Sequence, residues 1–314
     1  MNKQLRTTIA VEAYLSYRRN AGYKLQIEGE QLLRFARFAD DKNHRGALTI
    51  ELARLWATSN TTNRLTAARR IEALRGFAKY CLQFDSDTIV PPADLFGKAH
   101  RRLTPHIYSE SEIRDLLDAC DELHPIGGLR SHSCRAVFGL LASTGMRIGE
   151  ACVLRDKDVD LNKALVEVKN SKFGKSRWVP LHRSTVNHLR EYVEKRDNMR
   201  LYKKDNRFFA GDYGRCLSAI AVRYAFGLIR KRLGWRSRGD YQYPRVHDLR
   251  HTFICRTIQM WYEEGVDIDK KILCLSTYVG HTKVTDTFWY LTATPELLAL
   301  AAARTSKDGE VIDA

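Results

Sequence analysis

Six polar side chains in the last two thirds of the chain have the chemistry needed to attack a phosphodiester. In order along the chain they are Arg147, Lys172, His247, Arg250, His281 and Tyr290. Guanidinium groups donate paired hydrogen bonds to the non-bridging oxygens of a phosphate, and ammonium and imidazole groups move protons. A tyrosine can form a covalent intermediate at phosphorus. Each residue alone is common, so the order and spacing of the six carry the prediction of a phosphodiester-cleaving site.

Local motifs indicate which elements must position these side chains. Residues 144–150 end an apolar helix at a glycine and begin another helix, on which Arg147 and Glu150 stand three residues apart. Glu150 could orient Arg147, although a surface ion pair would have the same spacing. His247 and Arg250 share one face of a helix that begins at residue 247 or 248.

A β-hairpin interrupts this helix-rich part of the chain. The runs 164–169 and 176–181 have the composition of strands, and the turn 170–175 between them contains Lys172 and Lys175. Further helices are expected over 183–199, 215–233, 248–264 and 295–303, and Gly280 marks another helix end just before His281. The chain has fourteen tyrosines, so composition alone does not single out Tyr290.

The first part of the chain is expected to be a separate helical domain. Prolines, a glycine and basic residues near 90–105 indicate a linker, which divides the chain into 1–100, a linker over 101–108, and 109–314. Helices are expected over 9–19, 28–40 and 61–81. Residues 1–104 carry 18 Lys and Arg against 10 Asp and Glu, and the other 210 residues carry 34 against 27. The excess positive charge is therefore about twice as dense in the first part, which suggests that this part grips a nucleic acid backbone.

Four basic residues on the helix expected over 61–81 are candidates for that grip. They are Arg64, Arg69, Arg75 and Lys79, and three of them (69, 75 and 79) lie away from the apolar stripe of the helix. The alternative is that these charges only solvate a helix face. The net charge of +15 favours a polyanionic partner, either nucleic acid or an acidic membrane surface. The chain has no apolar run long enough to span a bilayer and no secretory signal at its start, and its seven scattered cysteines indicate reduced thiols in the cytosol.

The motifs together resemble the tyrosine recombinase, or phage integrase, family of Xer and Cre-type enzymes. The matching text covers 144–150, 172–181, 247–253 and 279–281, with Tyr290 nine residues after His281. The resemblance is strong over about 110–292 and looser over 5–100. It implies a mainly α fold with a small β-sheet: an N-terminal helical (SAM-like) core-binding domain and an α+β catalytic domain, which together form a C-shaped DNA clamp. The ending of the chain is similar to integrases carried by transposable elements or plasmids.

The resemblance also implies a role for each residue. Tyr290 would be the nucleophile and leave a 3′-phosphotyrosyl link, and Arg147 and Arg250 would clamp the phosphate. Lys172 would protonate the leaving 5′-oxygen, with Lys175 as a rival. His247 would take the proton of the phenol, and His281 would donate a hydrogen bond to the phosphate. Glu150 would orient Arg147. The residues expected to contact DNA are Arg64, Arg69, Arg75, Lys79, Lys175 and Arg177.

The implied partner is double-stranded DNA. A homo- or hetero-tetramer would bind it on a synapse, alone or with partner recombinases. The expected location is the cytoplasm, at the bacterial nucleoid. A tail helix over about 295–304 could dock on its own domain or on a neighbouring protomer. No cofactor, metal ion or membrane is expected, because side-chain cations stabilise the phosphate and the phosphotyrosyl bond conserves the energy needed for rejoining. Two alternatives remain open, a topoisomerase that relaxes DNA by the same chemistry and a DNA-binding accessory protein without catalysis.

Overall fold

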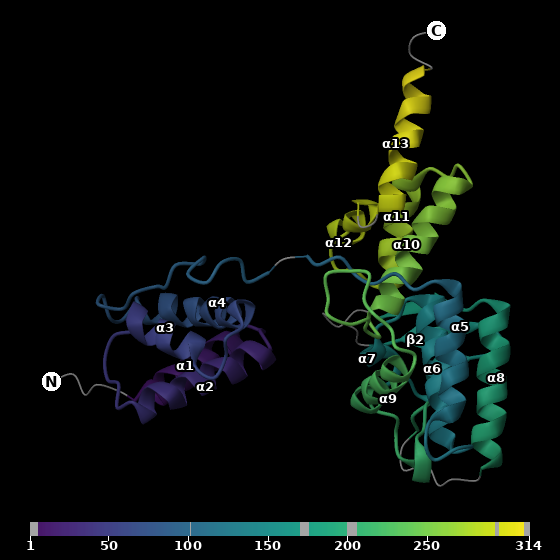
Figure 1. Ribbon diagram of the computed structural model, residues 1–314. Helices are drawn as coiled ribbons and strands as arrows, with labels where there is room; N and C mark the ends of the chain where they lie inside the picture. Colours follow the sequence, from purple (N-terminus) through teal and green to yellow (C-terminus); the bar gives the residue numbers. More distant parts are fainter. Residues whose placement is uncertain (1–5, 101, 170–175, 200–205, 293–294, 311–314) are drawn as a thin grey trace. The chain divides into compact units, whose positions relative to one another are not determined.

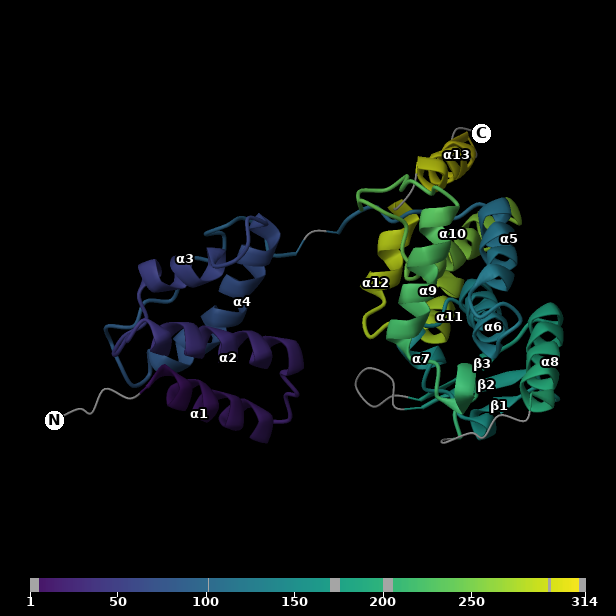
Figure 2. The ribbon, with the colours of Figure 1, turned by 60° about the horizontal axis from the view of Figure 1, so that its bottom comes forward.

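The computed structural model describes residues 6–100, 102–169, 176–199, 206–292 and 295–310. The chain divides into two compact units, Met1–Arg102 and Leu103–Ala314, which Figures 1 and 2 show from two directions. The assignment of the first unit to DNA binding and of the second to catalysis stays a prediction. Within the described segments, every helix is too short or too polar to cross a lipid bilayer.

The first unit is a bundle of four helices. They are α1 (Thr7–Asn20), α2 (Gln26–Asp41), α3 (Ile50–Thr58) and α4 (Arg64–Cys81). The expected helices near 9–19, 28–40 and 61–81 are confirmed as α1, α2 and α4, whereas α3 was not expected. Phe35 of α2 makes edge-to-face contacts with Trp56 of α3 and Phe77 of α4, at centroid distances of 5.2 and 6.2 Å. These rings hold the helices around one apolar core.

The second unit combines nine helices of the described residues with a small sheet. The helices are α5 (Glu110–Asp118), α6 (Leu129–Thr144), α7 (Ile148–Ala151), α8 (Arg183–Asn198), α9 (Ala219–Arg232), α10 (Asp248–Glu263), α11 (Ile268–Val279), α12 (Thr285–Phe288) and α13 (Pro295–Glu310). The strands β1 (Val159–Asp160), β2 (Leu165–Val168) and β3 (Arg177–Pro180) form an antiparallel sheet in the order β1-β2-β3. The two strands expected from the sequence are confirmed as β2 and β3, and β1 is an addition.

Helix α6 lies at the centre of this unit and packs on α5, α8 and α10 (Figure 1). Its buried side chains, including Phe138 and Leu141, join the inward residues of the sheet, Val166 and Val179, in one core. Val166 and Val179 are paired across β2 and β3, so the hairpin is fixed to the core by its apolar face. The core thereby fixes the C-terminal end of α6 and the base of the hairpin.

A second apolar cluster joins the later helices. Ile254 and Ile258 of α10 meet Ile272 of α11 and Tyr290, which belongs to a 3-10 turn over Trp289–Thr292. Leu297 of α13 is also buried in this cluster. The first turns of α13 therefore pack on the chain's own second unit, against α10 and the 3-10 turn.

Three expected boundaries are wrong. The helix expected over 61–81 begins at Arg64, because the Asn63 side chain caps it. The helix expected over 215–233 begins at Ala219, because the Ser218 side chain caps it and the preceding Cys216 pairs in a β-bridge with Ala210. The tail helix expected over about 295–304 extends to Glu310. The helices expected over 183–199 and 248–264 are confirmed to within one residue at each end as α8 and α10.

Candidate active site

Gly145 turns the chain so that Arg147 enters the site. This glycine ends α6 in the left-handed conformation, with φ of 61°, and a Cβ there would lie 2.5 Å from the Phe253 ring of α10. The absence of a side chain therefore lets α10 approach the end of α6. At that approach the Nη1 of Arg250 donates to the Gly145 carbonyl at 2.8 Å. Gly145 thus lets Arg147 and Arg250 lie close to each other where α10 meets the end of α6.

Glu150 is a buried carboxylate shared by two arginines. It accepts from Arg147 Nη1 at 2.9 Å, and its two oxygens accept from the two terminal nitrogens of Arg177 at 3.2 and 2.8 Å. Burial opposes ionisation of Glu150, but the hydrogen bonds and charges of Arg177 and Arg147 lower its pKa below the ordinary value. Glu150 is therefore charged and orients Arg147, as the sequence suggested.

Arg177 faces the protein interior, which differs from the DNA contact expected for it. Its Nε donates to the Tyr278 carbonyl at 2.7 Å, and its terminal nitrogens are held by Glu150. A Cβ on Gly280 would lie 2.7 Å from Arg177 Nη1, and Gly280 has a φ of 71°. Arg147 Nη2 donates to the Gly280 carbonyl at 2.8 Å. The two arginines therefore hold the end of α11, the point from which the chain continues to His281.

Arg250 is a buried cation that has an open hydrogen-bonding position. Its side chain is 2% exposed, and its Nη2 has no hydrogen-bond partner among the described atoms. Burial and the nearby Arg147 lower the pKa of Arg250 to about 9, which leaves it protonated at neutral pH. A buried, charged group with an unpaired N–H is costly unless an anion binds it. The arrangement therefore fits a phosphate held between Arg250 and Arg147.

The two expected histidines flank this position and are neutral in the free protein. Burial, followed by the charges of Arg250, Arg245 and Arg147, lowers the pKa of His247 to about 4. Burial, Arg250 and Arg147 lower the pKa of His281 to about 3. His281 Nδ1 lies 2.7 Å from the Thr287 hydroxyl, which fixes its ring. An incoming phosphate would offset the positive potential and raise both pKa values.

Tyr290 completes the cluster from the 3-10 turn. Its side chain is 3% exposed, and its ring stacks on that of His281 with centroids 6.1 Å apart and planes at 12°. An ionised Tyr290 would raise the pKa of Arg250, so the phenol lies near the buried guanidinium. Five of the six expected residues are therefore gathered in one place.

The hydroxyl of Tyr290 contacts His251, a residue that the sequence interpretation did not include. Tyr290 Oη and His251 Nδ1 are 2.6 Å apart, whereas the expected partner was His247. The rings of His247 and His251 are in edge-to-face contact at 4.9 Å. Their spacing of four residues on one helix could have indicated a second imidazole on the same face.

The other expected site residues lie elsewhere. Lys172 and Lys175 lie outside the described residues, between β2 and β3. On α4 of the first unit, Arg64, Arg69 and Lys79 are exposed, and Arg75 is half-buried with Nη1 bonded to the Pro91 carbonyl. Across the described segments, His, Cys, Asp and Glu side chains nowhere form a group of three that could hold a metal ion.

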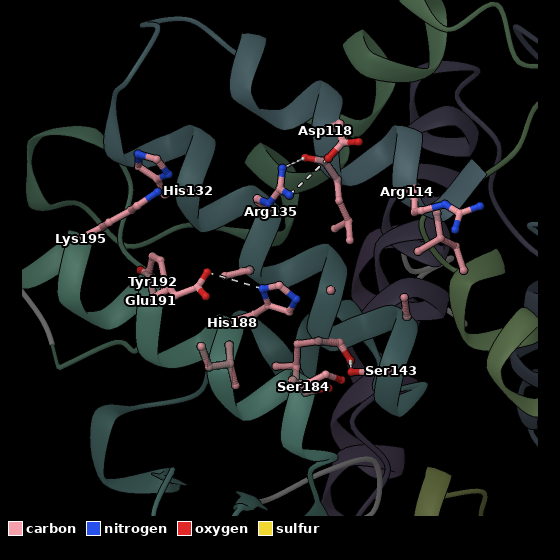
Figure 3. A pocket seen from close by; sticks show the side chains of 18 of the residues that line it. Arg114, Asp118, His132, Arg135, Ser143, Ser184, His188, Glu191, Tyr192 and Lys195 are labelled. Atoms are coloured by element: carbon pink, nitrogen blue, oxygen red, sulfur yellow. Dashed lines mark hydrogen bonds and ion pairs between the residues drawn. The ribbon is translucent and has the colours of Figure 1, made fainter. Parts of the chain in front are cut away.

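A separate cavity of about 530 Å³ lies between α5, α6 and α8. Its rim is polar, with an ion pair between Arg135 and Asp118 on one side and His188 beside Glu191 on the other (Figure 3). Its lining also includes the apolar side chains of Ile113, Leu117 and Leu140. It contains none of the six expected residues, so the cluster around Arg250 is distinct from this cavity.

The fold and the site together define a tyrosine recombinase. The model of the "Phage integrase family" matches residues 107–296. A putative integrase/recombinase of Sinorhizobium fredii, y4rB, is 36% identical over 308 residues, which cover 96% of this chain and 97% of that protein. The tyrosine recombinase XerA of Thermococcus kodakarensis is 27% identical over 291 residues, 92% of each chain. The chain belongs to the phage integrase family, whose members cleave and rejoin DNA in site-specific recombination.

Solved structures show the same fold at low sequence identity. The Tn1549 transposon integrase bound to transposon right end DNA aligns with a TM-score of 0.69 and 17% identity, over 96% of this chain and 99% of that chain. A lambda integrase tetramer bound to a Holliday junction aligns with a TM-score of 0.65 and 16% identity, over 92% and 78% of the two chains. The mainly helical fold with a small sheet is therefore confirmed.

Proposed function

We propose that the protein recombines DNA at specific sites, with Tyr290 as the nucleophile. The phenolic oxygen attacks a phosphorus of the DNA backbone, forms the 3′-phosphotyrosyl bond and releases the 5′-oxygen. The observation that carries this proposal is the buried Arg250, which has an open N–H next to Arg147 and close to the Tyr290 phenol. A phosphate in this position would satisfy the open N–H and be presented to the nucleophile.

Each group in the cluster then has a distinct task. Arg147 and Arg250 stabilise the charge on the non-bridging oxygens as phosphorus becomes pentacoordinate. His247 and His281 donate hydrogen bonds to the same phosphate. Lys172, which lies between β2 and β3 in the sequence, supplies a proton to the leaving 5′-oxygen. These side-chain cations and donors can supply the whole stabilisation of the phosphate, and the phosphotyrosyl bond retains the energy for rejoining.

The first unit supplies DNA affinity in this proposal. Arg64, Arg69 and Lys79 are exposed on α4, where they can neutralise phosphates without reading sequence. The two units would enclose the duplex as a clamp. Recombination joins two duplexes, so four protomers would act together on a synapse, as the lambda integrase tetramer does on its Holliday junction. The similar proteins include a Sinorhizobium integrase/recombinase and a transposon integrase, so we place the protein on nucleoid or plasmid DNA in the cytoplasm.

Covalent capture tests the proposal and identifies the target sequence in the same experiment. The full-length protein is incubated with a randomised pool of nicked duplexes, in EDTA and without ATP. The nick lets the cleaved fragment leave and traps the adduct. The pool is then denatured, and DNA that remains attached to protein is sequenced. The expected result is one enriched sequence in the wild type and none with Tyr290→Phe.

Tyr278→Phe is the matched control. Burial raises the pKa of Tyr278 to about 12, and its hydroxyl bonds to the Pro180 carbonyl at 3.3 Å, so it is a poor nucleophile and its loss should leave adduct formation intact. An adduct that survives Tyr290→Phe but not Tyr278→Phe would overturn the assignment. A plasmid that carries two copies of the captured sequence separates the alternatives, because recombination exchanges the flanking DNA whereas a topoisomerase only changes the linking number.

A further inference from the structure

The Tyr290 phenol carries a proton that must leave as the bond to phosphorus forms. An unperturbed tyrosine has a pKa of about 10, so unaided ionisation at neutral pH is unfavourable. The chemistry therefore requires an acceptor within hydrogen-bond reach of the hydroxyl. In the described part of the chain, His251 is in that position, with Nδ1 2.6 Å from Tyr290 Oη.

We infer that His251 is the base that takes the phenolic proton of Tyr290 during strand cleavage. This inference rests on the proposed function and assigns a residue outside the six of the family signature. The rings of His251 and Tyr290 are 5.5 Å apart and tilted by 38°, which lets Nδ1 point at the hydroxyl rather than at the face of the phenol. His251 lies one turn after His247 on α10, a rigid element whose first turn also carries Arg250.

The other two imidazoles are less well placed for this task. His281 lies face to face with the Tyr290 ring, with planes at 12°, and its Nδ1 is bonded to the Thr287 hydroxyl. His247 makes an edge-to-face contact with His251 and stands beside Arg250. Both are therefore free to bind the phosphate, while His251 serves the nucleophile.

The surroundings keep His251 unprotonated before DNA binds. Burial comes first among the causes that lower its pKa, followed by His247, Arg245, Arg250 and His281, and the result is about 2. His251 is therefore neutral before DNA binds, and its Nδ1 can accept from the phenol if the ring proton is on Nε2. The negative phosphate then offsets the arginine charges and raises the proton affinity of the ring.

The proton balance closes over one cleavage step. The O–H proton of Tyr290 moves to Nδ1 of His251 as the oxygen–phosphorus bond forms. The bond from phosphorus to the 5′-oxygen breaks, and Lys172 gives its proton to that oxygen. Rejoining runs the same transfers in reverse, so the protonated His251 returns its proton to the departing phenolic oxygen.

The first test reads the position of the ring proton in the free protein. Long-range ¹H–¹⁵N NMR of the full chain at pH 7 reports the tautomer of each histidine, and the signals that vanish in His251→Asn belong to His251. A bare Nδ1 and a protonated Nε2 are expected, with an Nδ1 shift that changes in Tyr290→Phe. A proton on Nδ1 would overturn the inference, since that nitrogen could not then accept another.

The second test separates the base from the acid on the captured DNA sequence. Its scissile phosphate carries either the natural 5′-oxygen or a bridging sulfur, which leaves without protonation. His251→Asn keeps an acceptor near the position of Nδ1 but cannot take up a proton, so cleavage should fall by roughly 100-fold or more on both substrates. Lys172→Ala should be slow on oxygen and close to wild type on sulfur. His188→Gln, a distant exposed histidine of α8, is the control.

The pH dependence distinguishes proton uptake from mere positioning of the phenol. Cleavage by His251→Asn should rise about tenfold per pH unit, because hydroxide replaces the missing base, and this slope requires a folded, active enzyme. The inference about His251 is overturned, and the proposed function is not, if His251→Asn cleaves the sulfur substrate as fast as the wild type does. The same holds if its cleavage rate on the natural substrate lies within threefold of the wild-type rate. Failure of the wild type to form any adduct overturns the proposed function itself.

Discussion

Replacement of Glu150 by Gln should destabilise the second unit and misplace Arg147. The Glu150 side chain is 9% exposed and balances two guanidinium groups, those of Arg147 and Arg177, and the Arg177 side chain is only 10% exposed. Removal of one partner from a buried ion pair costs about 3–5 kcal/mol. Gln keeps the shape and one acceptor oxygen, so we expect a loss of about 2–4 kcal/mol.

The pH dependence of this loss has a definite sign. The pKa of Glu150 is lower in the folded protein than its ordinary value. Its contribution is therefore fully present above the unfolded pKa of about 4.3 and is lost as the pH falls through the lower folded value. The stability difference between wild type and Glu150→Gln should be constant near neutral pH and shrink below about pH 4.

Urea unfolding followed by pulsed hydrogen exchange measures this effect on the second unit alone. Peptides that cover 129–151 report α6 and α7, and peptides that cover 7–41 report the first unit as an internal reference. Glu191→Gln is the matched control, because Glu191 is an exposed carboxylate of α8 beside His188, and exposed pairs contribute about 0–1 kcal/mol. A loss below about 1 kcal/mol for Glu150→Gln, or one that persists unchanged at pH 3, would refute the role given to the buried carboxylate.

Further expected outcomes concern the phosphate clamp, the end of α11 and the first unit. Arg250→Lys keeps the positive charge but loses the paired N–H donors of the guanidinium. The rate of single-turnover cleavage should therefore fall by roughly 100–1,000-fold, while the DNA affinity measured by filter binding stays within threefold of wild type. Gly280→Ala should displace Arg177 and strain a left-handed residue, with a loss of about 1–3 kcal/mol in the same urea assay; an unchanged midpoint would contradict this. Asn63→Ala removes the side-chain cap of α4 and should cost about 1 kcal/mol, visible only in peptides of the first unit. Lys79→Gln should reduce the slope of log affinity against log salt by about 1, whereas a slope equal to wild type would exclude a phosphate contact.

The elements with clear local signals were predicted well. The apolar spacing of 67, 71, 74 and 78 indicated α4, although the cap at Asn63 starts the helix three residues later than expected, and Gly145 indicated the end of α6. Helix α3 was missed because it spans only nine residues, and its burial against Phe35 is a tertiary effect. Strand β1 has two residues and becomes a strand only through its pairing with β2.

The site could be predicted only in part, because spacing identifies side chains but not their contacts. The residue types that meet phosphate follow from the motifs. Which imidazole reaches Tyr290 depends on how the turn at 289–292 packs on α10, and that packing selects His251. Arg177 was expected to contact DNA together with Lys175, which precedes it by two residues. The space left by Gly280 and the buried Glu150 instead draw it inward, and no local pattern shows that.

The same contacts connect β3, the start of α7 and the end of α11. Arg177 begins β3, and its guanidinium reaches both Glu150 and the carbonyl of Tyr278. Glu150 holds Arg147, and Arg147 holds the carbonyl of Gly280 at the end of α11. A shift of the hairpin would therefore move Arg177, and the displaced carboxylate would release Arg147. Because these bonds form one network, we expect β3, Arg147 and the segment that leads to Tyr290 to be positioned together rather than one at a time.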